Sequence, residues 1–366
     1  MTTDTEARNG TAGAAFDNGR AEAFVGKVLG DTGAANAVLL ATIGDRLGLF
    51  TTLAASGPVT SAQLAGLAEV DERYAREWLS GMTAAGYIDY DPASHCFALP
   101  PEHAPALAQE HGPLFFGGVH EMMSSWSGVV DRVIDAFRHG GGVPQSAYDE
   151  HMWQGLERFT AGWFENLLLP VWLPAMPRVE AALRAGADVA DIGCGRGRAL
   201  IKLAEAFPAS RFVGYDVFEP AVDQARENAH AAGVEERVRF ERRDASGGLP
   251  DQFDVITTFD VVHDAVDPGG LLAAIRSALR PDGTYVCVDI ACSEHIEENA
   301  GPIGTLFYTA SLLYCMTTSL AHHGEGLGTC GLPEVKLRDL CDGAGFGHVR
   351  RVPLDNPFNN LYEVTP

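Results

Sequence analysis

The chain has 366 residues, of which 46% are hydrophobic, and a formal net charge of −23. This length suits two globular domains, and the acidic balance disfavours nucleic acids and anionic lipids as partners because it repels their phosphates. Seven cysteines stand without a C-x-x-C spacing, which argues against a disulfide framework or a zinc knuckle and favours the cytoplasm. No stretch reaches the ~20 apolar residues of a membrane span.

The first hundred residues predict a disordered tail over 1–22 and a mainly helical domain over 23–104. Apolar residues at helical spacing predict one or two helices between Phe24 and Phe50, and two short capped helices and a small hairpin follow. This order is typical of a winged helix. Its second short helix nevertheless carries three acidic residues against two arginines, so we expect dimerisation or a substrate lid rather than DNA binding.

Residues 105–185 are expected to form a helical linker and substrate lid. The segment is rich in aromatic residues, among them Trp126, Tyr148 and Trp153, which suit either a core or the wall of an apolar pocket. The run Gly140-Gly141-Gly142 predicts a break in the helical pattern.

After Gly186 strands alternate with helices, as a parallel, doubly wound α/β sheet requires. We predict five strands and a terminal hairpin, giving seven strands in all, at 189–194, 211–217, 238–244, 253–262, 284–290, 348–354 and 359–364. Helices are expected over 198–207, 219–232, 268–279 and 333–343.

The first of these strands runs into Asp191-Ile192-Gly193-Cys194-Gly195-Arg196-Gly197, which resembles the glycine-rich loop of class I S-adenosylmethionine (SAM)-dependent methyltransferases. Arg198 stands where the nicotinamide fingerprint would place its third glycine. An acid at position 191 suits the ammonium and sulfonium of SAM, whereas it would repel a pyrophosphate. The resemblance covers residues 186–366. It implies a Rossmann-like, seven-stranded α/β methyltransferase domain behind the winged helix, with SAM as cofactor.

The resemblance extends to acidic residues at the ends of successive strands. It implies that Asp216 accepts the ribose hydroxyls and that Asp244-Ala245 holds the adenine amino group, while Asp260 ends the fourth strand. Open α/β sheets bind ligands at the carboxyl ends of their strands. We therefore expect cofactor contacts from Asp191, Gly193, Gly195, Gly197, Asp216, Val217, Asp244, Ala245 and Asp260.

His263-Asp264 follows the fourth strand, at the switch point between the first and fourth strands. SAM is already activated, so an enzyme has only to align the acceptor, exclude water and remove the acceptor's proton where it carries one; histidine suits that proton transfer at neutral pH. The winged helix, the loop and this pair together resemble small-molecule O-methyltransferases, particularly the winged-helix type common in actinobacteria. That resemblance implies that His263 is the general base and that Asp289 orients it. Ala265 stands where a tryptophan usually follows the pair, so a phenol is not implied as the acceptor. We expect O- or C-methylation, and N-methylation stays open.

Three other functions are kept as alternatives. A related group, the 2-keto-acid C-methyltransferases, uses a histidine here as a metal ligand; the helix after the fifth strand lacks a second histidine, although His295 is close in sequence, and we expect no metal. A SAM-binding cyclase or isomerase would need no base, and a winged-helix DNA-binding regulator would need a basic helix. We expect a cytoplasmic enzyme of secondary metabolism with a small-molecule substrate, dimeric through its N-terminal helices, with no nucleic-acid or membrane partner.

Overall fold

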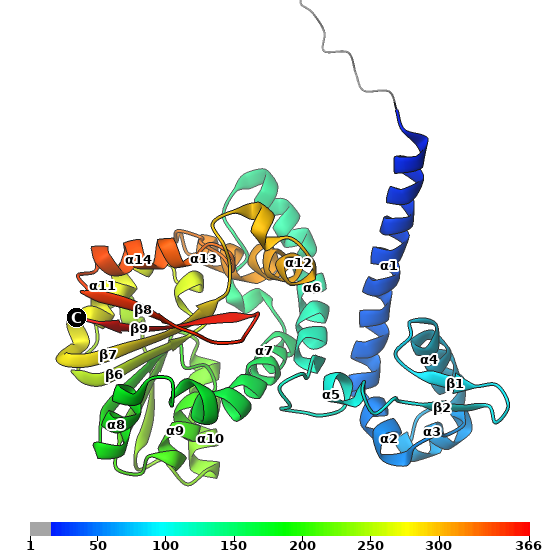
Figure 1. Ribbon diagram of the computed structural model, residues 1–366, viewed down its shortest axis with the longest axis horizontal. Coiled ribbons are helices and arrows are strands. Elements are labelled where there is room, and N and C mark those ends of the chain that lie inside the picture. The colour runs from blue at the N-terminus through cyan, green and yellow to red at the C-terminus, as the bar shows by residue number, and fades with distance from the viewer. Residues whose placement is uncertain (1–15) are drawn as a thin grey trace, which may run out of the picture. The chain divides into compact units, whose positions relative to one another are not determined.

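The structure, a computed structural model, describes residues 16–366 and divides into two compact units, one ending at Pro100 and the other beginning at Pro101. Within residues 16–100, four helices precede a short antiparallel hairpin (Figure 1). In chain order these elements are α1 (Asn18–Arg46), α2 (Leu49–Ser56), α3 (Ser61–Ala68), α4 (Glu72–Ala84), β1 (Asp89–Asp91) and β2 (Cys96–Ala98).

The helix starts in this first unit follow local capping signals. Thr60 forms a reciprocal capping box with Gln63 at the start of α3, and the Asp71 carboxylate accepts the first backbone N–H groups of α4. The predicted tail over 1–22 ends too late, because α1 already begins at Asn18, where the Asp17 carboxylate accepts the N–H of Arg20. The rest of that predicted tail, residues 1–15, lies outside the described residues.

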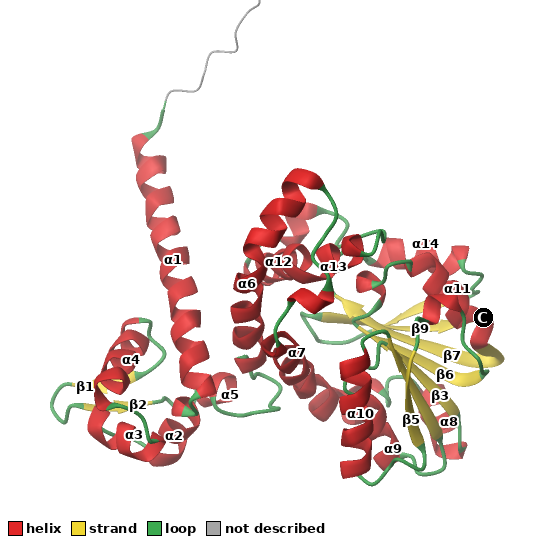
Figure 2. Cartoon of the chain, turned by 180° about the vertical axis from the view of Figure 1, so that it is seen from behind, coloured by secondary structure: helices red, strands yellow, loops and turns green. Residues whose placement is uncertain are grey.

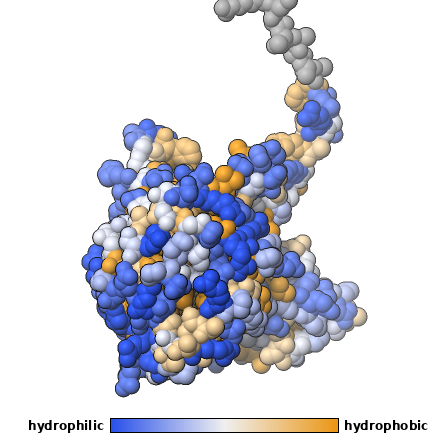
Figure 3. All heavy atoms as spheres, turned by 60° about the vertical axis from the view of Figure 1, so that its left-hand side comes forward, coloured by the Kyte–Doolittle hydropathy of each residue, from blue (hydrophilic) through white to orange (hydrophobic). Residues whose placement is uncertain are grey.

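Helix α1 has two different halves. Its C-terminal part packs into the unit's core: Gly44 leaves room for the Trp78 ring, whose indole N–H donates to the Leu40 carbonyl at 2.8 Å. A stripe of exposed apolar side chains also follows α1: Phe24, Val25, Val28, Leu29, Leu39 and Ile43 on the helix and Leu47 directly after its end. Figure 3 shows hydrophobic colour on this helix. Among the described residues no single helix could cross a membrane, although α1 and α2, bent by 72°, pass a length-and-composition test together.

The second unit begins with a helical region. Its elements are α5 (Ala104–Leu107), α6 (Gly117–His139), η1 (Gln145–Ala147), α7 (Glu150–Trp163), the π-helix η2 (Phe164–Trp172) and α8 (Pro177–Ala185). The backbones of α6 and α7 touch where glycines face each other, since a Cβ on Gly118 would lie 2.5 Å from the Gly155 carbonyl oxygen. The predicted break falls between α6 and α7, with positive φ at Gly140 and Gly141.

A seven-stranded sheet follows, in the order β5-β4-β3-β6-β7-β9-β8. Its strands are β3 (Asp188–Ile192), β4 (Arg211–Asp216), β5 (Val238–Arg242), β6 (Phe253–Phe259), β7 (Leu279–Ile290), β8 (His348–Val352) and β9 (Asn359–Thr365). The first five run parallel, and β9 runs antiparallel to both of its neighbours. The predicted fold class is confirmed.

Helices cover both faces of the sheet, because strand side chains alternate between two apolar cores. Val189, Val255 and Val286 face the core that includes α8, α9 (Arg198–Ala206) and α10 (Glu219–Ala231). Ala190, Ile256 and Tyr285 face the core under α11 (Pro268–Ala278) and α14 (Glu334–Gly343). Figure 2 shows these two helices beside the sheet, seen from behind. The other elements are η3 (Ala245–Gly247), η4 (Val262–Asp264), η5 (Ile296–Asn299), α12 (Pro302–Ala310), the π-helix η6 (Ser311–Cys315) and α13 (Met316–Ala321).

Five strands stop earlier than predicted: β3 at Ile192, β4 at Asp216, β5 at Arg242, β6 at Phe259 and β8 at Val352. Strand β6 ends at Phe259 because Asp260 adopts a left-handed φ of 55°, after which η4 holds His263 in a turn. Strand β5 ends at Arg242, and Asp244 instead caps η3 by accepting the Ser246 N–H at 3.0 Å.

Candidate active site

The glycine-rich loop joins β3 to α9 through three residues with left-handed backbones, Gly193, Gly195 and Gly197, at φ of 68°, 52° and 81°. A Cβ at Gly193 would lie 2.5 Å from Val261, and one at Gly197 would lie 2.5 Å from Phe240. At Gly195 a Cβ would meet nothing within 4 Å, so this peptide faces open space. The loop therefore keeps an exposed stretch of backbone that a ligand can approach closely.

Asp216, the last residue of β4, ties this loop to the neighbouring strand. Its two carboxylate oxygens accept the backbone N–H groups of Gly195 and Phe218, each at 2.9 Å. Burial raises the pKa of Asp216, and these backbone donors oppose the rise. Val217 beside it is exposed, and Asp244 and Ala245 lie at the end of the adjacent strand β5. The expected cofactor acids of β4 and β5 thus share one edge of the sheet.

Asp191 lies deeper than the sequence suggested. Its side chain is 2% exposed and accepts a hydrogen bond from the Thr257 hydroxyl at 2.6 Å. Burial raises its pKa to about 7, and the nearby Asp216 carboxylate adds to the rise. Asp191 therefore sits beneath the loop as an acid close to its titration point at neutral pH.

His263 is 3% exposed and is held between two carboxylates. Its Nδ1 lies 2.6 Å from Oδ1 of Asp289 on β7, and its Nε2 lies 3.2 Å from Oδ1 of Asp264. Burial alone disfavours the imidazolium, but Asp289 and Asp264 together raise the pKa of His263 well above its ordinary range. Asp260 completes the acidic surroundings and accepts from the Asn359 amide at 2.8 Å.

The thiol of Cys315 lies close to His263. One ligand atom from each of His263, Asp264 and Cys315 lies within 4.8 Å of the others, a spacing that could hold a metal ion. The Thr329 hydroxyl donates to the Cys315 sulfur at 3.0 Å. His295, considered as a second histidine ligand, is instead an exposed residue near Glu294, outside this cluster. No local pattern indicated Cys315, which is 52 positions from His263 along the chain.

Aromatic side chains from the lid region lie beside these groups. Trp153 of α7 packs on Phe218, with ring centroids 4.7 Å apart, and on Tyr314 at 6.1 Å. Tyr314 contacts Tyr148 at 5.4 Å and directly precedes Cys315. Of the aromatic residues noted in the sequence, Tyr148 and Trp153 thus stand near the reaction centre, where Phe218 and Tyr314 join them.

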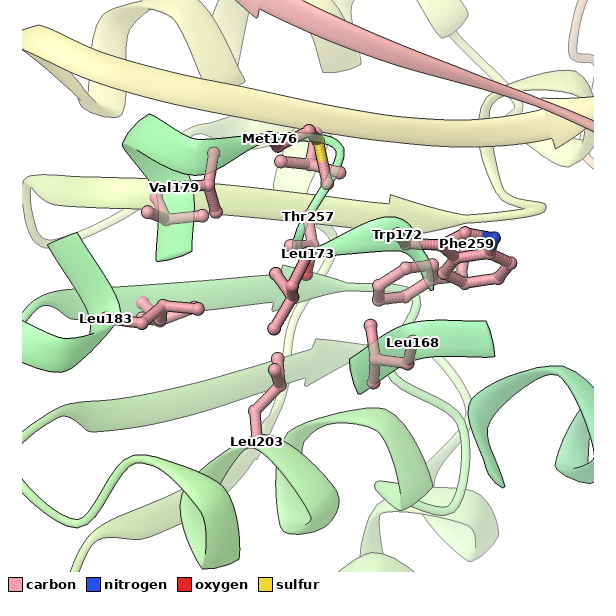
Figure 4. Close-up of a pocket in the computed structure, with 12 residues that line it drawn as sticks. Leu168, Trp172, Leu173, Met176, Val179, Leu183, Leu203, Thr257 and Phe259 are labelled. Atoms are coloured by element: carbon pink, nitrogen blue, oxygen red, sulfur yellow. The ribbon is translucent and has the colours of Figure 1, made fainter. Parts of the chain in front are cut away.

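A separate small cavity lies between η2, α8 and the sheet (Figure 4). Apolar side chains line it, including Leu168 and Trp172 from η2 and Phe259 from β6. Its volume of about 10 Å³ leaves room for one water molecule at most. Its polar group, the Thr257 hydroxyl, already donates to Asp191, so this void belongs to the core and does not bind an acceptor.

Comparison with known proteins identifies both parts of the chain. A model of Rv2258c-like winged helix-turn-helix domains matches residues 34–109, and a model of methyltransferase domains matches residues 183–319. The chain carries a methyltransferase domain. The resemblance inferred from the glycine-rich loop is thereby confirmed, and the methyltransferase domain follows a winged-helix domain as the sequence predicted.

Two curated relatives match part of the chain. It is 32% identical over 142 residues to 27-O-demethylrifamycin SV methyltransferase of Amycolatopsis mediterranei, over 35% of this chain and 52% of that protein. It is 34% identical over 106 residues to the ubiquinone biosynthesis O-methyltransferase of Ruegeria pomeroyi, over 29% of this chain and 42% of that protein. The matches thus span about half or less of each relative.

Solved structures resemble the chain over most of its length. The mitomycin 7-O-methyltransferase MmcR is 21% identical, with a TM-score of 0.68 and coverage of 95% of this chain and 98% of its own. Human N-acetylserotonin methyltransferase, solved in complex with SAM, is 17% identical, with a TM-score of 0.69 and coverage of 96% and 99%. At these identities the likeness establishes a shared fold.

Proposed function

We propose that this protein transfers the methyl group of SAM to a small-molecule acceptor by O- or C-methylation. One observation carries the proposal. The glycine-rich loop follows β3 and is hydrogen-bonded to Asp216, and the neighbouring strand β6 leads to His263, which is bonded to Asp289. Both groups therefore lie at the same edge of the sheet. The activities named for the relatives, which include two O-methyltransferases, agree with it. The human structural neighbour that contains SAM agrees with the cofactor.

The residues at the loop fit this cofactor. Gly195 leaves open space beside the loop backbone, where an added Cβ would meet nothing within 4 Å, and Asp216 has carboxylate oxygens for ribose hydroxyls. We assign the adenine to Asp244 and Ala245, with Val217 alongside, and the cationic methionine part to Asp191 and Asp260. When bound, SAM supplies an electrophilic methyl group on a sulfonium leaving group.

His263 is assigned as the general base and Asp289 as the residue that orients it. The bond to Asp289 fixes the ring through Nδ1, which leaves Nε2 to receive a proton from the acceptor. Nε2 already lies 3.2 Å from the Asp264 carboxylate, so an acceptor hydroxyl would have to take the place of this carboxylate at Nε2. The buried surroundings exclude water, which strengthens each of these interactions.

The first experiment measures cofactor binding. SAM and S-adenosylhomocysteine should raise the melting temperature, because a ligand that binds only the native state stabilises it, and NAD should not. Asp216→Ala should weaken binding by removing the ribose acceptor, and equal calorimetric affinity for both proteins would contradict that role. A metabolite screen with isotopically labelled SAM, read by mass spectrometry, then identifies the acceptor.

The cluster of His263, Asp264 and Cys315 favours a second candidate, metal-dependent methyl transfer. In that case His263 would bind the metal through Nε2 while Asp289 holds Nδ1, the arrangement by which carboxylates commonly orient metal-bound histidines. Activity would then depend on added metal and would be abolished by chelators. Full activity in a metal-stripped protein would reject this candidate.

We also propose a cytoplasmic homodimer, acting in secondary metabolism and joined through α1. The support is the exposed apolar stripe on α1, whose seven residues fall within about 140° of arc at 100° per residue. DNA binding is not proposed, because the two arginines of α4 each pair with a glutamate of the same helix, Arg73 with Glu77 and Arg76 with Glu72.

A further inference from the structure

A network of ion pairs, called the ladder below, joins Glu150, Glu157 and Glu165 to Arg196, Arg198 and Lys202, and so connects helix α7 to the glycine-rich loop. Three glutamates of α7 and η2, spaced seven and eight residues apart and hence near one face, meet Arg196 of the glycine-rich loop and Arg198 and Lys202 of α9. The pairs are Arg196 with Glu150, Arg196 with Glu157 at 3.0 Å, Arg198 with Glu157 at 3.1 Å, Arg198 with Glu165 at 3.5 Å, and Lys202 with Glu165 at 2.5 Å.

This ladder differs from ordinary surface pairs in burial and connectivity. The Arg196 and Glu157 side chains are 18% and 24% exposed, and each contacts two partners of opposite charge. Isolated exposed pairs contribute little, whereas half-buried networks are screened less by salt. Arg196 is itself a loop residue between Gly195 and Gly197, and its carbonyl accepts from the Asn228 amide at 3.0 Å. The loop conformation is therefore bonded on one side to α10 and on the other to α7.

The same side of α7 also reaches the aromatic side chains next to Cys315. Trp153, one helical turn before Glu157, packs on Phe218 and Tyr314. The N–H of Phe218 donates to Asp216, and Asp216 also accepts from Gly195 of the loop. The loop is thus connected to Phe218 in two ways. One set of contacts runs from Arg196 through Glu157 and Trp153 of α7, and the other runs from Gly195 through Asp216.

Helix α7 is also bounded by non-α-helical segments at both ends. The positive-φ glycines at 140 and 141 precede it, and the π-helix η2 with Pro170 follows it. Such breaks let one helix shift against its neighbours with little distortion of its own hydrogen bonds. On one side, helix α7 thus carries both the glutamates that pair with the loop arginine and the tryptophan that packs on the aromatic side chains.

We propose that Arg196, Glu157 and Trp153 are positioning residues that couple cofactor binding at the glycine-rich loop to the order of the acceptor side of the site. The proposal rests on the cofactor assignment above. Because a coupling free energy is reciprocal, an acceptor that orders α7 also tightens cofactor binding.

The test is hydrogen–deuterium exchange of the full chain with and without saturating S-adenosylhomocysteine. In the wild type the ligand should slow exchange both in peptides around residues 193–197 and in peptides over 150–163. Arg196→Gln should keep the loop protection at saturation but lose the protection of α7, with ligand affinity about 10-fold weaker, within the usual range of coupling effects. Glu157→Gln breaks the same contact from the other side and should behave alike. The double variant should add little to either single change.

Arg184→Gln is the matched control, because it removes an arginine–glutamate pair with Glu180 on α8, away from the loop. It should leave both protected regions unchanged. Protection of α7 that persists in Arg196→Gln and Glu157→Gln, or that is missing in the wild type while the loop is protected, would overturn the coupling alone. Absence of any ligand protection in the wild type would instead reject the cofactor assignment, so the two failures are distinguishable.

Discussion

The Nδ1 atom of His263 lies 2.6 Å from Oδ1 of Asp289, and the same oxygen accepts the backbone N–H of Ile290 at 2.8 Å. The carboxylate is 1% exposed and is fixed by its own strand before it contacts the ring. Asp289 therefore sets the orientation of the imidazole with little freedom of its own.

Replacing His263 should separate binding from chemistry. His263→Ala should leave SAM affinity nearly intact, while methyl transfer falls by the ~10²–10⁴-fold typical of a lost proton-transfer group. Asp289→Asn should reduce transfer less, because the acid orients the ring and takes no substrate proton. Calorimetry and a labelled-methyl assay measure the two quantities. Full methyl transfer by His263→Ala would mean that the enzyme acts only by aligning the acceptor and excluding water. The acceptor would then be an amine that is already neutral and needs no base.

The rate should rise with pH above the ordinary range of histidine. A general base must be neutral to accept a proton. Burial lowers the pKa of His263, but Asp289 and Asp264 raise it by more, so methyl transfer should increase as the pH rises through that raised pKa. Asp264→Asn removes one carboxylate and should move the midpoint of the pH–rate profile down toward ~6.5. The stabilisation from this charged cluster should follow the opposite course: it is complete below ~6.5 and is lost as pH rises through the raised pKa. An unchanged midpoint in Asp264→Asn would argue against the assignment of the base.

The buried carboxylate of Asp191 should lower the free energy of unfolding at alkaline pH. Its folded-state pKa of about 7 lies above its unfolded value, so the folded chain holds a proton that the unfolded chain has lost, and stability falls as pH rises from ~4 to ~7. Asp191→Asn keeps an acceptor for Thr257 and removes the buried charge. It should therefore raise the melting temperature at pH 8, because the buried charge lowers the free energy of unfolding by about 4 kcal/mol at most, and change it little at pH 4.

Asp251→Asn, which alters an exposed carboxylate paired with Arg239, serves as the control and should show no such pH dependence. Equal melting temperatures for Asp191→Asn and wild type at pH 8 would mean that the folded protein does not bury a charge there. Weaker SAM binding by Asp191→Asn would agree with a cofactor role for the acid.

Charge on the apolar stripe of α1 should dissociate the proposed dimer. Leu29→Glu keeps a good helix former but places a carboxylate where the side chain is 73% exposed and flanked by Val25 and Val28. Size exclusion with light scattering should then give the monomer mass. Ala34→Glu lies on another side of the helix and should leave the dimer intact. A wild-type protein that is already monomeric would refute this interface, and wild-type binding to lipid vesicles would assign the stripe to a membrane instead.

The sequence by itself determined the features that depend on neighbouring residues. Thr60 and Asp71 begin their helices through side-chain bonds to the next turn, and the alternation of strands and helices after Gly186 specifies a parallel sheet. Gly193, Gly195 and Gly197 mark the loop because left-handed backbone favours glycine wherever it occurs. The match of Asp289 to His263 came from resemblance, since no local rule joins residues 26 positions apart.

Only the tertiary structure decided what surrounds these residues. The sheet order places β6 beside both β3 and β7, so Asp191 meets Thr257 and becomes buried, although its sequence position suggested an accessible acid. The position of η6 beside the turn at η4 brings Cys315 to His263, and the position of α7 beside the glycine-rich loop joins Glu157 to Arg196. Burial and long-range pairing are properties of the packed layers. A linear pattern states which side chains are present, but the environment that sets their charge and contacts arises when distant segments exclude water together.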